Sequence, residues 1–589
     1  MCGIIGYIGN RKASPILFSG LKSLEYRGYD SVGMAIIGSK LRIKKDVGKI
    51  NEVNEKLNFL DLDGNIGIGH TRWATHGRVN RENTHPHLSN NRKIAVVHNG
   101  IIENYQELKD FLEKKNFKFY SKTDTEVIPN LVEFEMKNGK NFIDAVKASI
   151  KRLEGNFAVL IIHEDEDKLI AARKGAPLVI GVAEDEFFAA SDIPAFLKFT
   201  KNVVFLYDWD LAVLEKDKID FFNLMENKKV ERKVDTIEWN AEQAKKGEFE
   251  HFMLKEITEQ VETIQKAVAQ DERIVKKIVE VMKKSKGIFF VGCGSSFHAC
   301  LAASYIFSKV AHLHVNVVLG SEFANYKHFL TPETLVLAVS QSGETADVLE
   351  AVETAKGKGS KVISIVNVMG SSLTRHSDEF LLLNAGPEIC VLSTKTYTSQ
   401  LALLILLAYS FIGKFREAQK KLKYLWNVIY NLTSRTTREK IKKLAEMLKD
   451  REHIFVIGRG LQYATALEAA LKIKEVSYIH AEAFAGGELK HGTIALIEKG
   501  TPCIVFVSEE NEKEIISNAM EIKSRGGYII GISPKNNEVF DFWIKVPETN
   551  AANPICQIIP IQILAYQLAV LRGCDPDKPR NLAKSVTVK

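Results

Sequence analysis

Residues 288–294 read IFFVGCG, an apolar run that ends in a glycine-rich turn, and residues 454–460 repeat the pattern as IFVIGRG. A small-residue-rich stretch follows each copy. Strands that alternate with helices in this way are typical of parallel sheets with crossover helices. Two similar α/β units in tandem are therefore predicted. Around the first copy we expect strands at 287–291, 315–318, 334–339 and 361–366, and helices at 297–310 and 346–356.

A second pair of similar segments shows a chemical difference between the two copies. Residues 334–340 (TLVLAVS) resemble residues 501–508 (TPCIVFVS), but the first continues as QSGET and the second as EEN. A loop with three hydroxyls and a glycine at a helix start favours a bound phosphate. The simpler alternative is an N-cap, which needs only one Ser or Thr. Only the first copy is expected to bind phosphate.

The glycines of these turns also raise the question of a dinucleotide site. Gly292-x-Gly294, followed by Ser295 and Ser296, matches the start of that fingerprint and could face the phosphate loop. The third glycine is missing, because Phe297 stands in its place and Tyr463 in the second copy. The nucleotide interpretation is rejected on this ground.

The first 240 residues have a different sequence pattern, in which short apolar runs typical of strands outnumber a few predicted helices. A polar stretch at 240–250 then resembles an interdomain connection. We predict a first domain at 1–240, a linker at 241–250, α/β units at 251–430 and 431–575, and a tail at 576–589. The expected strands of the first domain are 66–69, 94–98, 157–162, 179–182, 187–190 and 203–207.

Cys2 becomes the N-terminal residue if Met1 is removed. An N-terminal cysteine combines a thiol nucleophile with an α-amine whose ordinary pKa, about 7.7–8, allows it to accept the thiol proton. Cysteine at position two also occurs without any function, so its assignment as a nucleophile depends on the other motifs.

Three further motifs supply groups that such a nucleophile needs. Arg72, after an apolar strand, suits capture of a carboxylate. Asn99 and Gly100 offer a side-chain amide and a backbone N–H to a developing oxyanion. Asp124 offers a carboxylate to an ammonium group. Each has an ordinary alternative, namely a surface cation, a turn and a helix cap, but together with Cys2 they suit an α-amino acid substrate.

Composition limits the possible classes of protein. A chain of 589 residues exceeds one ordinary core. The apolar stretch 401–413 is shorter than a membrane span and is predicted to be a buried helix, and no signal peptide is evident. Seven scattered cysteines without a C-x-x-C pair indicate a reducing cytoplasm and no cysteine metal site. The net charge of +7 is spread along the chain, so nucleic-acid binding is not indicated.

The motifs resemble those of a known family. CGIIG (2–6), YRGYDS (26–31), HTRWATHG (70–77) and HNG (98–100) are similar to N-terminal-nucleophile glutamine amidotransferases. SQSGET (340–345) and the tail RNLAKSVTV (580–588) resemble the sugar isomerase (SIS) domains of glutamine–fructose-6-phosphate aminotransferases. The resemblance runs end to end. It implies an αββα sandwich followed by two flavodoxin-like parallel-sheet subdomains.

The resemblance also implies site residues for the glutamine half. Cys2 is the nucleophile, and Asn99 and Gly100 form the oxyanion hole. Trp73 gates the passage of ammonia. The glutamine-binding residues are Arg72, Thr75, His76 and Asp124.

For the sugar half, the resemblance implies that Lys584 forms a Schiff base with the keto sugar and that Glu475 moves a proton between C1 and C2. His491 assists ring opening, and Lys472 joins the catalytic group. The residues implied to hold the sugar phosphate are Ser296, Ser340, Gln341, Ser342, Thr345, Val391 and Ala583.

The expected activity converts fructose 6-phosphate and glutamine into glucosamine 6-phosphate and glutamate, with ammonia passed internally. No cofactor or metal is expected, and the family is at least dimeric. One rival, an amidotransferase acting on phosphoribosyl pyrophosphate, needs a diphosphate loop with paired acidic residues, which the tandem pattern replaces. A non-enzymatic sugar-phosphate sensor would keep 340–345 but would not need Cys2, Glu475 or Lys584.

Overall fold

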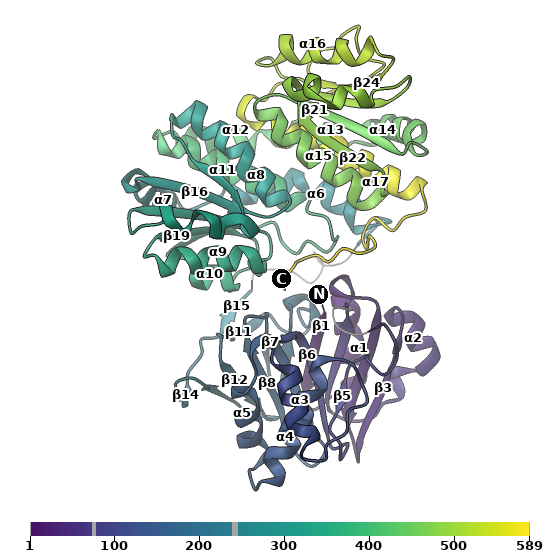
Figure 1. The fold of residues 1–589 in the computed structure, drawn as a ribbon, viewed down its shortest axis with the longest axis vertical. Coiled ribbons are helices and arrows are strands. Elements are labelled where there is room, and N and C mark those ends of the chain that lie inside the picture. The colour runs from purple at the N-terminus through teal and green to yellow at the C-terminus, as the bar shows by residue number, and fades with distance from the viewer. Residues whose placement is uncertain (1, 74–77, 238–245, 588–589) are drawn as a thin grey trace. The chain divides into compact units, whose positions relative to one another are not determined.

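The computed structural model describes residues 2–73, 78–237 and 246–587, and Figure 1 shows its elements. The chain divides into two compact units. The first comprises residues 1–245 together with 583–589, and the second comprises residues 246–582. The last seven residues therefore belong to the same unit as the N-terminus.

The first unit contains two sheets in which neighbouring named strands run antiparallel. The eight-stranded sheet has the order β15-β11-β9-β10-β1-β4-β2-β3, and the seven-stranded sheet has the order β14-β13-β12-β8-β7-β6-β5. The bounds of the first sheet are β1 Gly3–Ile8, β2 Ser31–Ile37, β3 Leu41–Val47, β4 Ile66–Arg72, β9 Val179–Ala183, β10 Glu186–Ala190, β11 Asn202–Phe205 and β15 Asp235–Thr236. Those of the second are β5 His87–Leu88, β6 Ile94–Ile102, β7 Gly155–His163, β8 Leu169–Lys174, β12 Asp210–Leu214, β13 Ile219–Asn223 and β14 Lys228–Val230.

These two sheets pack face to face between helices. Apolar side chains from both sheets, such as Ile4 and Leu160, share one buried cluster. The other face of the seven-stranded sheet packs on α3, α4 and α5 in a separate cluster, and α1 packs on β1 and β4. Alternating side chains of strands such as β6 thus enter two different cores, which is why these strands are apolar throughout. The helices are α1 Ala13–Leu24, α2 Ile50–Leu57, α3 Tyr105–Glu113, α4 Val127–Lys137 and α5 Phe142–Lys151.

The second unit contains two parallel five-stranded sheets with the same order of strands. They run β17-β16-β18-β19-β20 and β22-β21-β23-β24-β25, which is the 2-1-3-4-5 order of flavodoxin-like folds. The first has β16 Gly287–Gly292, β17 Asn316–Leu319, β18 Thr334–Ser340, β19 Lys361–Val366 and β20 Glu379–Leu382. The second has β21 His453–Gly458, β22 His480–Ala485, β23 Pro502–Phe506, β24 Tyr528–Ser533 and β25 Phe542–Lys545.

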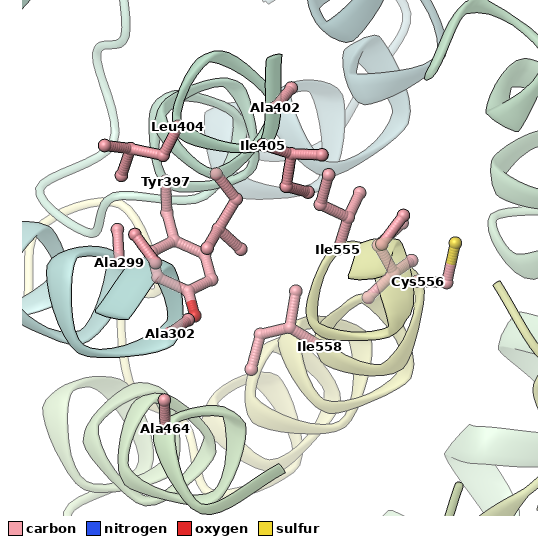
Figure 2. Packing of buried hydrophobic residues seen from close by; sticks show 14 of the residues in the cluster. Ala299, Ala302, Tyr397, Ala402, Leu404, Ile405, Ala464, Ile555, Cys556 and Ile558 are labelled. Atoms are coloured by element: carbon pink, nitrogen blue, oxygen red, sulfur yellow. The ribbon is translucent and has the colours of Figure 1, made fainter. Parts of the chain in front are cut away.

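Helices join these two sheets through one large apolar core. Figure 2 shows part of it, where Tyr397 of α11 lies beside Ala299 and Ala302 of α8, and near Ala464 of α15. Small residues on α8 and α15 allow these helices to pack closely. The helices are α6 Phe252–Ala267, α7 Glu272–Lys284, α8 Ser295–Ile306, α9 Ala346–Gly357, α10 Ser372–His376, α11 Lys395–Phe411, α12 Phe415–Lys423, α13 Leu425–Leu432, α14 Arg435–Leu448, α15 Leu461–Ser477, α16 Glu512–Lys523 and α17 Asn553–Leu571.

Two apolar helices are relevant to whether the chain contains a membrane-spanning segment. The stretch 401–413 lies mostly in α11, whose residues 395–408 are all buried, as predicted. Sequence reasoning overlooked α17, which is long and apolar enough to cross a membrane by length and composition. In its most apolar window, 83% of the residues are buried inside the structure, as in the core helix of a globular unit.

The expected fold class is confirmed, with antiparallel sheets in the first unit and tandem parallel sheets in the second. The predicted strands are present with small shifts of their ends. The helix expected at 297–310 begins earlier, at Ser295, and continues beyond Ile306 as a π-helical turn, Phe307–Ala311. The predicted domain boundaries stay predictions.

Candidate functional site

In the first unit, Cys2 lies directly before β1, at the centre of the eight-stranded sheet. Its Sγ accepts a hydrogen bond from the Trp73 backbone N–H at 3.2 Å. The Asn99 Nδ2 donates to the Cys2 carbonyl oxygen at 2.9 Å. Two of the predicted partners, from β6 and from the end of β4, therefore meet at the nucleophile.

Glycines permit this close approach of strands. A Cβ on Gly28 would lie 2.7 Å from the Arg72 carbonyl carbon and from the Trp73 nitrogen. Gly100 has φ +119°, and a Cβ there would lie 2.0 Å from the Asn156 carbonyl oxygen. Larger residues at either position would displace the backbone that carries the site.

The two charged candidates for binding glutamine are both buried. Arg72 ends β4, and Asp124 begins the 3₁₀ turn η3 (Asp124–Glu126). The Asp124 Oδ2 accepts from the Ile102 N–H at 2.7 Å, so its carboxylate is fixed at the end of β6. Burial lowers the pKa of Arg72, while Cys2, Asp30 and Asp124 oppose that effect. The guanidinium and these acidic groups therefore lie within electrostatic range of one another.

The surroundings of the Cys2 thiol have opposing effects on its pKa. Burial raises the pKa of Cys2, whereas the hydrogen bond from Trp73 and the Arg72 charge lower it. A thiol held mainly in its neutral form needs a base when it attacks. Trp73, the predicted gate, also makes an edge contact with Tyr29 at 5.6 Å between ring centres. Thr75 and His76 lie outside the described residues.

A layer of buried histidines adjoins this site, and the sequence reasoning did not identify it. His70 stacks on His85 at 4.0 Å between ring centres, and His85 contacts His87 at 4.6 Å. The His70 Nε2 lies 3.1 Å from the carbonyl oxygen of His98, the residue before Asn99. Burial lowers the pKa of all four histidines, so they are neutral at pH 7.

In the second unit, the predicted phosphate loop joins β18 to α9. The Ser340 Oγ accepts from the Gly343 N–H at 3.0 Å and lies 3.2 Å from the Thr345 Oγ1. Gly343 has φ +65°, and a Cβ there would lie 2.1 Å from the Ser371 Oγ. The Asn367 N–H donates to the Gln341 carbonyl, and the Ser342 Oγ accepts from the Glu344 N–H at 3.1 Å.

Ser296 lies at the start of α8, just after β16, the strand that pairs with β18. The carboxyl ends of these adjacent parallel strands therefore supply both sets of hydroxyls. The Ser296 Oγ accepts from the Gln400 Nε2 at 3.0 Å. This is the end of a parallel sheet at which ligands usually bind.

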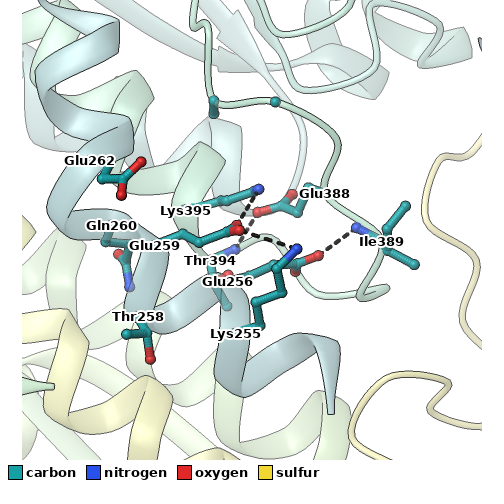
Figure 3. Close-up of polar contacts among 12 residues, drawn as sticks. Lys255, Glu256, Thr258, Glu259, Gln260, Glu262, Glu388, Ile389, Thr394 and Lys395 are labelled. Carbon is teal, nitrogen blue, oxygen red and sulfur yellow. Dashed lines mark hydrogen bonds and ion pairs between the residues drawn. The ribbon is translucent and has the colours of Figure 1, made fainter. Parts of the chain in front are cut away.

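The loop that carries Val391 is held by buried acids, as Figure 3 shows. The Glu256 Oε1, on α6, accepts from the N–H groups of Ile389 at 2.6 Å and Cys390 at 3.1 Å. The Val391 N–H donates to the Asp577 carbonyl at 3.1 Å. These contacts fix the loop and the beginning of the predicted tail to each other.

Lys472 and Glu475 belong to a buried network of charges on α15. The Lys472 Nζ lies 2.7 Å from the Glu475 Oε2 and 3.4 Å from Glu468, and it donates to the Ser295 Oγ at 3.1 Å. Burial by itself lowers the pKa of Lys472, but the Glu468 and Glu475 carboxylates outweigh it and hold the pKa above its ordinary value. Lys472 is therefore a cation held between two carboxylates, beside the serines of α8.

Glu468 is a member that sequence reasoning missed. It is fully buried, and it accepts from the Ser295 Oγ at 2.8 Å and pairs with the His298 Nδ1 at 2.8 Å. The available signal was its spacing, because residues 468, 472 and 475 follow an i, i+4, i+7 pattern on one face of a helix otherwise rich in alanine.

One catalytic candidate, His491, is not joined to this network in the described part of the chain. His491 ends the 3₁₀ segment Gly486–His491 and is exposed, and no hydrogen bond or ion pair links it to the other sugar candidates in the described part of the chain. Ala583 and Lys584 belong to the first unit. Just before them, the Arg580 N–H donates to the Tyr478 hydroxyl at 2.7 Å, beside the C-terminal end of α15. In 2–73, 78–237 and 246–587, no group of three or more His, Cys, Asp or Glu residues has the arrangement of a metal site.

Comparison with known proteins agrees with this geometry. Residues 70–198 match the glutamine amidotransferase domain model, and residues 281–410 and 447–572 each match the SIS domain model. The solved C-terminal domain of a glucosamine–fructose-6-phosphate aminotransferase from Francisella tularensis is 34% identical, with a TM-score of 0.53, over 57% of this chain and 99% of that one. The fold and site thus define a glutamine amidotransferase domain followed by two sugar isomerase domains.

Full-length relatives narrow the class further. Two proteins named glutamine–fructose-6-phosphate aminotransferase (isomerizing), from Thermococcus kodakarensis and Pyrococcus horikoshii, are each 46% identical over 100% of both chains. A third of that name, from Caldanaerobacter subterraneus, is 44% identical with the same coverage. This chain belongs to the glutamine–fructose-6-phosphate aminotransferase (isomerizing) family.

Proposed function

We propose that this enzyme transfers the amide nitrogen of glutamine to fructose 6-phosphate and forms glucosamine 6-phosphate and glutamate. The observation that best supports this proposal is the arrangement around Cys2. Its thiol accepts a hydrogen bond from the Trp73 N–H, and its carbonyl oxygen accepts one from the Asn99 amide. The tandem parallel sheets, with a hydroxyl-rich loop in the first, support a phosphosugar acceptor.

In the glutamine half, removal of Met1 frees the α-amine of Cys2, which takes the thiol proton. The thiolate attacks the glutamine Cδ, and the Asn99 Nδ2 and Gly100 N–H stabilise the tetrahedral oxyanion. Collapse expels ammonia and leaves a thioester, which water hydrolyses to glutamate and the free thiol. Arg72 binds the substrate carboxylate and Asp124 binds its ammonium group. Thr75 and His76 complete the pocket, and Trp73 controls the passage of ammonia.

In the sugar half, the hydroxyls and N–H groups of the 340–345 loop hold the phosphate, together with Ser296, Val391 and Ala583. His491 transfers the proton needed to open the ring. The Lys584 amine adds to the C2 carbonyl and forms a Schiff base with loss of water, and ammonia then displaces the lysine amine to give the 2-imino sugar. Glu475 removes the C1 proton and returns it at C2, so the imine becomes a 2-amino aldose.

Lys472 has a supporting part in that step. Its ammonium group contacts Glu475 directly and Ser295 beside Ser296. It therefore orients the proposed base toward the serines of α8 and compensates its charge in a buried setting. No redox step occurs, and none of the steps uses a cofactor.

We also propose a homodimer in which the His491 segment serves the partner's site, because His491 is exposed and, within the described residues, forms no hydrogen bond or ion pair with the other proposed sugar residues. The seven cysteines are free thiols, which supports work in a reducing cytoplasm.

The test incubates purified protein, with processing of Met1 checked by mass, with glutamine and fructose 6-phosphate. Glucosamine 6-phosphate and glutamate are expected in equal amounts. Parallel reactions replace glutamine by ammonium, or fructose 6-phosphate by phosphoribosyl pyrophosphate. Absence of amino sugar in the glutamine and ammonium reactions, from a folded and processed enzyme, overturns the proposal.

A further inference from the structure

A cavity of about 1100 Å³ opens in the second unit at the carboxyl ends of β21 and β23. The turn at Arg459–Gln462 and the loop at Glu509–Asn511 form one side, and Tyr305 and Lys309 lie on another. None of the described residues proposed above for glutamine or the sugar phosphate lines this space. It is large enough for a small-molecule site.

The internal repeat relates this cavity to the phosphate site of the first sheet. The two sheets have the same strand order, and Gly458 and Gly460 correspond to Gly292 and Gly294. The loop after β23 corresponds to residues 340–345 after β18. The cavity therefore occupies, in the second copy, the position that the phosphate loop occupies in the first.

The correspondence extends to the helix that faces each site. Glu475 lies 14 residues after Leu461, the start of α15 (475 − 461), and Lys309 lies 14 residues after Ser295, the start of α8 (309 − 295). Lys309 thus stands where the proposed proton-transfer base stands in the first site. The charge at this position is reversed, so this second site has no carboxylate where the first has its proposed base.

The loop has also changed its charge. Glu509 and Glu510 replace the polar residues that follow Ser340 in the first copy. The Lys309 Nζ pairs with the Glu510 carboxylate at 2.5 Å, so that lysine is already compensated. Two carboxylates in the former phosphate loop repel an anion, so a phosphosugar is less favoured here than in the first copy.

Several polar groups that line the cavity remain available to a ligand. Gln462 is 2% exposed, and its Oε1 accepts from the Ser508 Oγ and the Asn511 Nδ2, each at 3.2 Å. Within the described residues its Nε2 donates to no protein acceptor, and the Arg459 guanidinium has no hydrogen bond or ion pair. The carboxylates of Glu509 and Glu514 likewise have none. Within the described residues these donors and acceptors form no bonds to protein, so they are free to bond with a ligand that enters the cavity.

We propose that this cavity binds an unphosphorylated amino sugar. Gln462 Nε2 and Arg459 donate to its hydroxyl and ring oxygens, and Glu509 and Glu514 receive its ammonium group. The rings of Tyr305 and Tyr409, with the aliphatic side chains around them, provide the apolar surface against which a sugar face packs. The site binds without catalysis, because Lys309 and its paired Glu510 replace the base and the phosphate loop.

The test measures binding of glucosamine to the full-length protein by calorimetry, in saturating fructose 6-phosphate so that the first site is filled. Glucose tests the role of the amine. Glucosamine is expected to bind at least tenfold more tightly than glucose. Gln462→Leu and Glu514→Gln should each weaken it at least tenfold, while the matched variant Gln265→Leu, outside the cavity, should not change it.

Aminotransferase activity and thermal unfolding of each variant report folding and the proposed function separately. Glu514 is exposed, so Glu514→Gln should fold normally. If Gln462→Leu fails to fold, binding of glucosamine to Glu514→Gln tests the proposed site. No binding of glucosamine to the wild-type protein with its first site filled overturns the proposal. Equal binding of glucose, or binding unchanged in Glu514→Gln, does so as well.

Discussion

The two candidate sites use different kinds of chemical groups. In the first unit, backbone N–H groups and one amide at strand ends surround a buried thiol, and its neighbouring histidines are neutral. In the second, side chains of one helix, α15, place ionised groups against one another, with Lys472 between Glu468 and Glu475. The first site holds a neutral nucleophile until it is activated, whereas the second holds charges that are already compensated. Removing one group should therefore have local consequences in the first and shared consequences in the second.

The largest effect is expected from Cys2→Ala. Loss of the nucleophile should reduce glutamine hydrolysis by about 10³-fold or more, because no other group forms the thioester. Synthesis from free ammonium should persist. Glutamate release and amino-sugar formation are assayed side by side, with Cys574→Ala as the matched thiol control. Loss of both activities in a folded Cys2→Ala protein would contradict two separate sites.

Lys472→Met should damage the second site and its fold together. It leaves two buried carboxylates without their cation, a change that costs about 3–5 kcal/mol. Ammonium-dependent synthesis should fall about 100-fold and the second unit should unfold at lower temperature, while glutamine hydrolysis persists. The control is Lys474→Met, since Lys474 is two residues away and exposed. Equal effects of both substitutions would show that the buried network does not matter.

Glu468→Gln is a milder test of the same network. Glutamine keeps the shape of the side chain but loses the charge that faces Lys472 and His298. We expect kcat for ammonium-dependent synthesis to fall about tenfold, with KM for fructose 6-phosphate unchanged and a displaced pH profile. Glu468→Asp should restore part of the rate. An unaltered pH profile would mean that Glu468 acts only in packing.

The smallest expected effect concerns the histidine layer. Burial depresses the pKa of His87, so its stabilising contribution is present above its unfolded pKa, about 6.5, and is lost as the pH falls below that value. His87→Gln should reduce the pH dependence of unfolding of the first unit by up to about 1.4 kcal/mol per pH unit between pH 6.5 and 5. The exposed His453→Gln is the control. Thermal unfolding at several pH values tests this, and an unchanged slope in His87→Gln would refute it.

Much of this organisation is predictable from sequence, because repeated strand-and-turn patterns and the residues around Cys2 are local signals. Asn99 and Cys2 could be associated through motifs, although 97 positions separate them. Arg27 was visible only as part of a motif, and its ion pair with Asp192 at 2.9 Å depends on the completed sheet. Glu468 lies in a helix whose composition resembles a core segment. Its partner Ser295 comes from the other copy of the repeat, a pairing that neither segment indicates alone.

The last residues of the chain have a consequence for how the protein can be divided. Asp577 accepts from the N–H groups of Phe252 and Met253 at 2.8 Å each, so the second unit is closed by contacts between its own two ends. From Ala583 onward the chain belongs to the first unit again. The polypeptide therefore passes between the units twice, and a fragment cut only near residue 245 separates the first unit from its own final segment. Any expression of that unit alone should supply residues 583–589 as a peptide or a fusion.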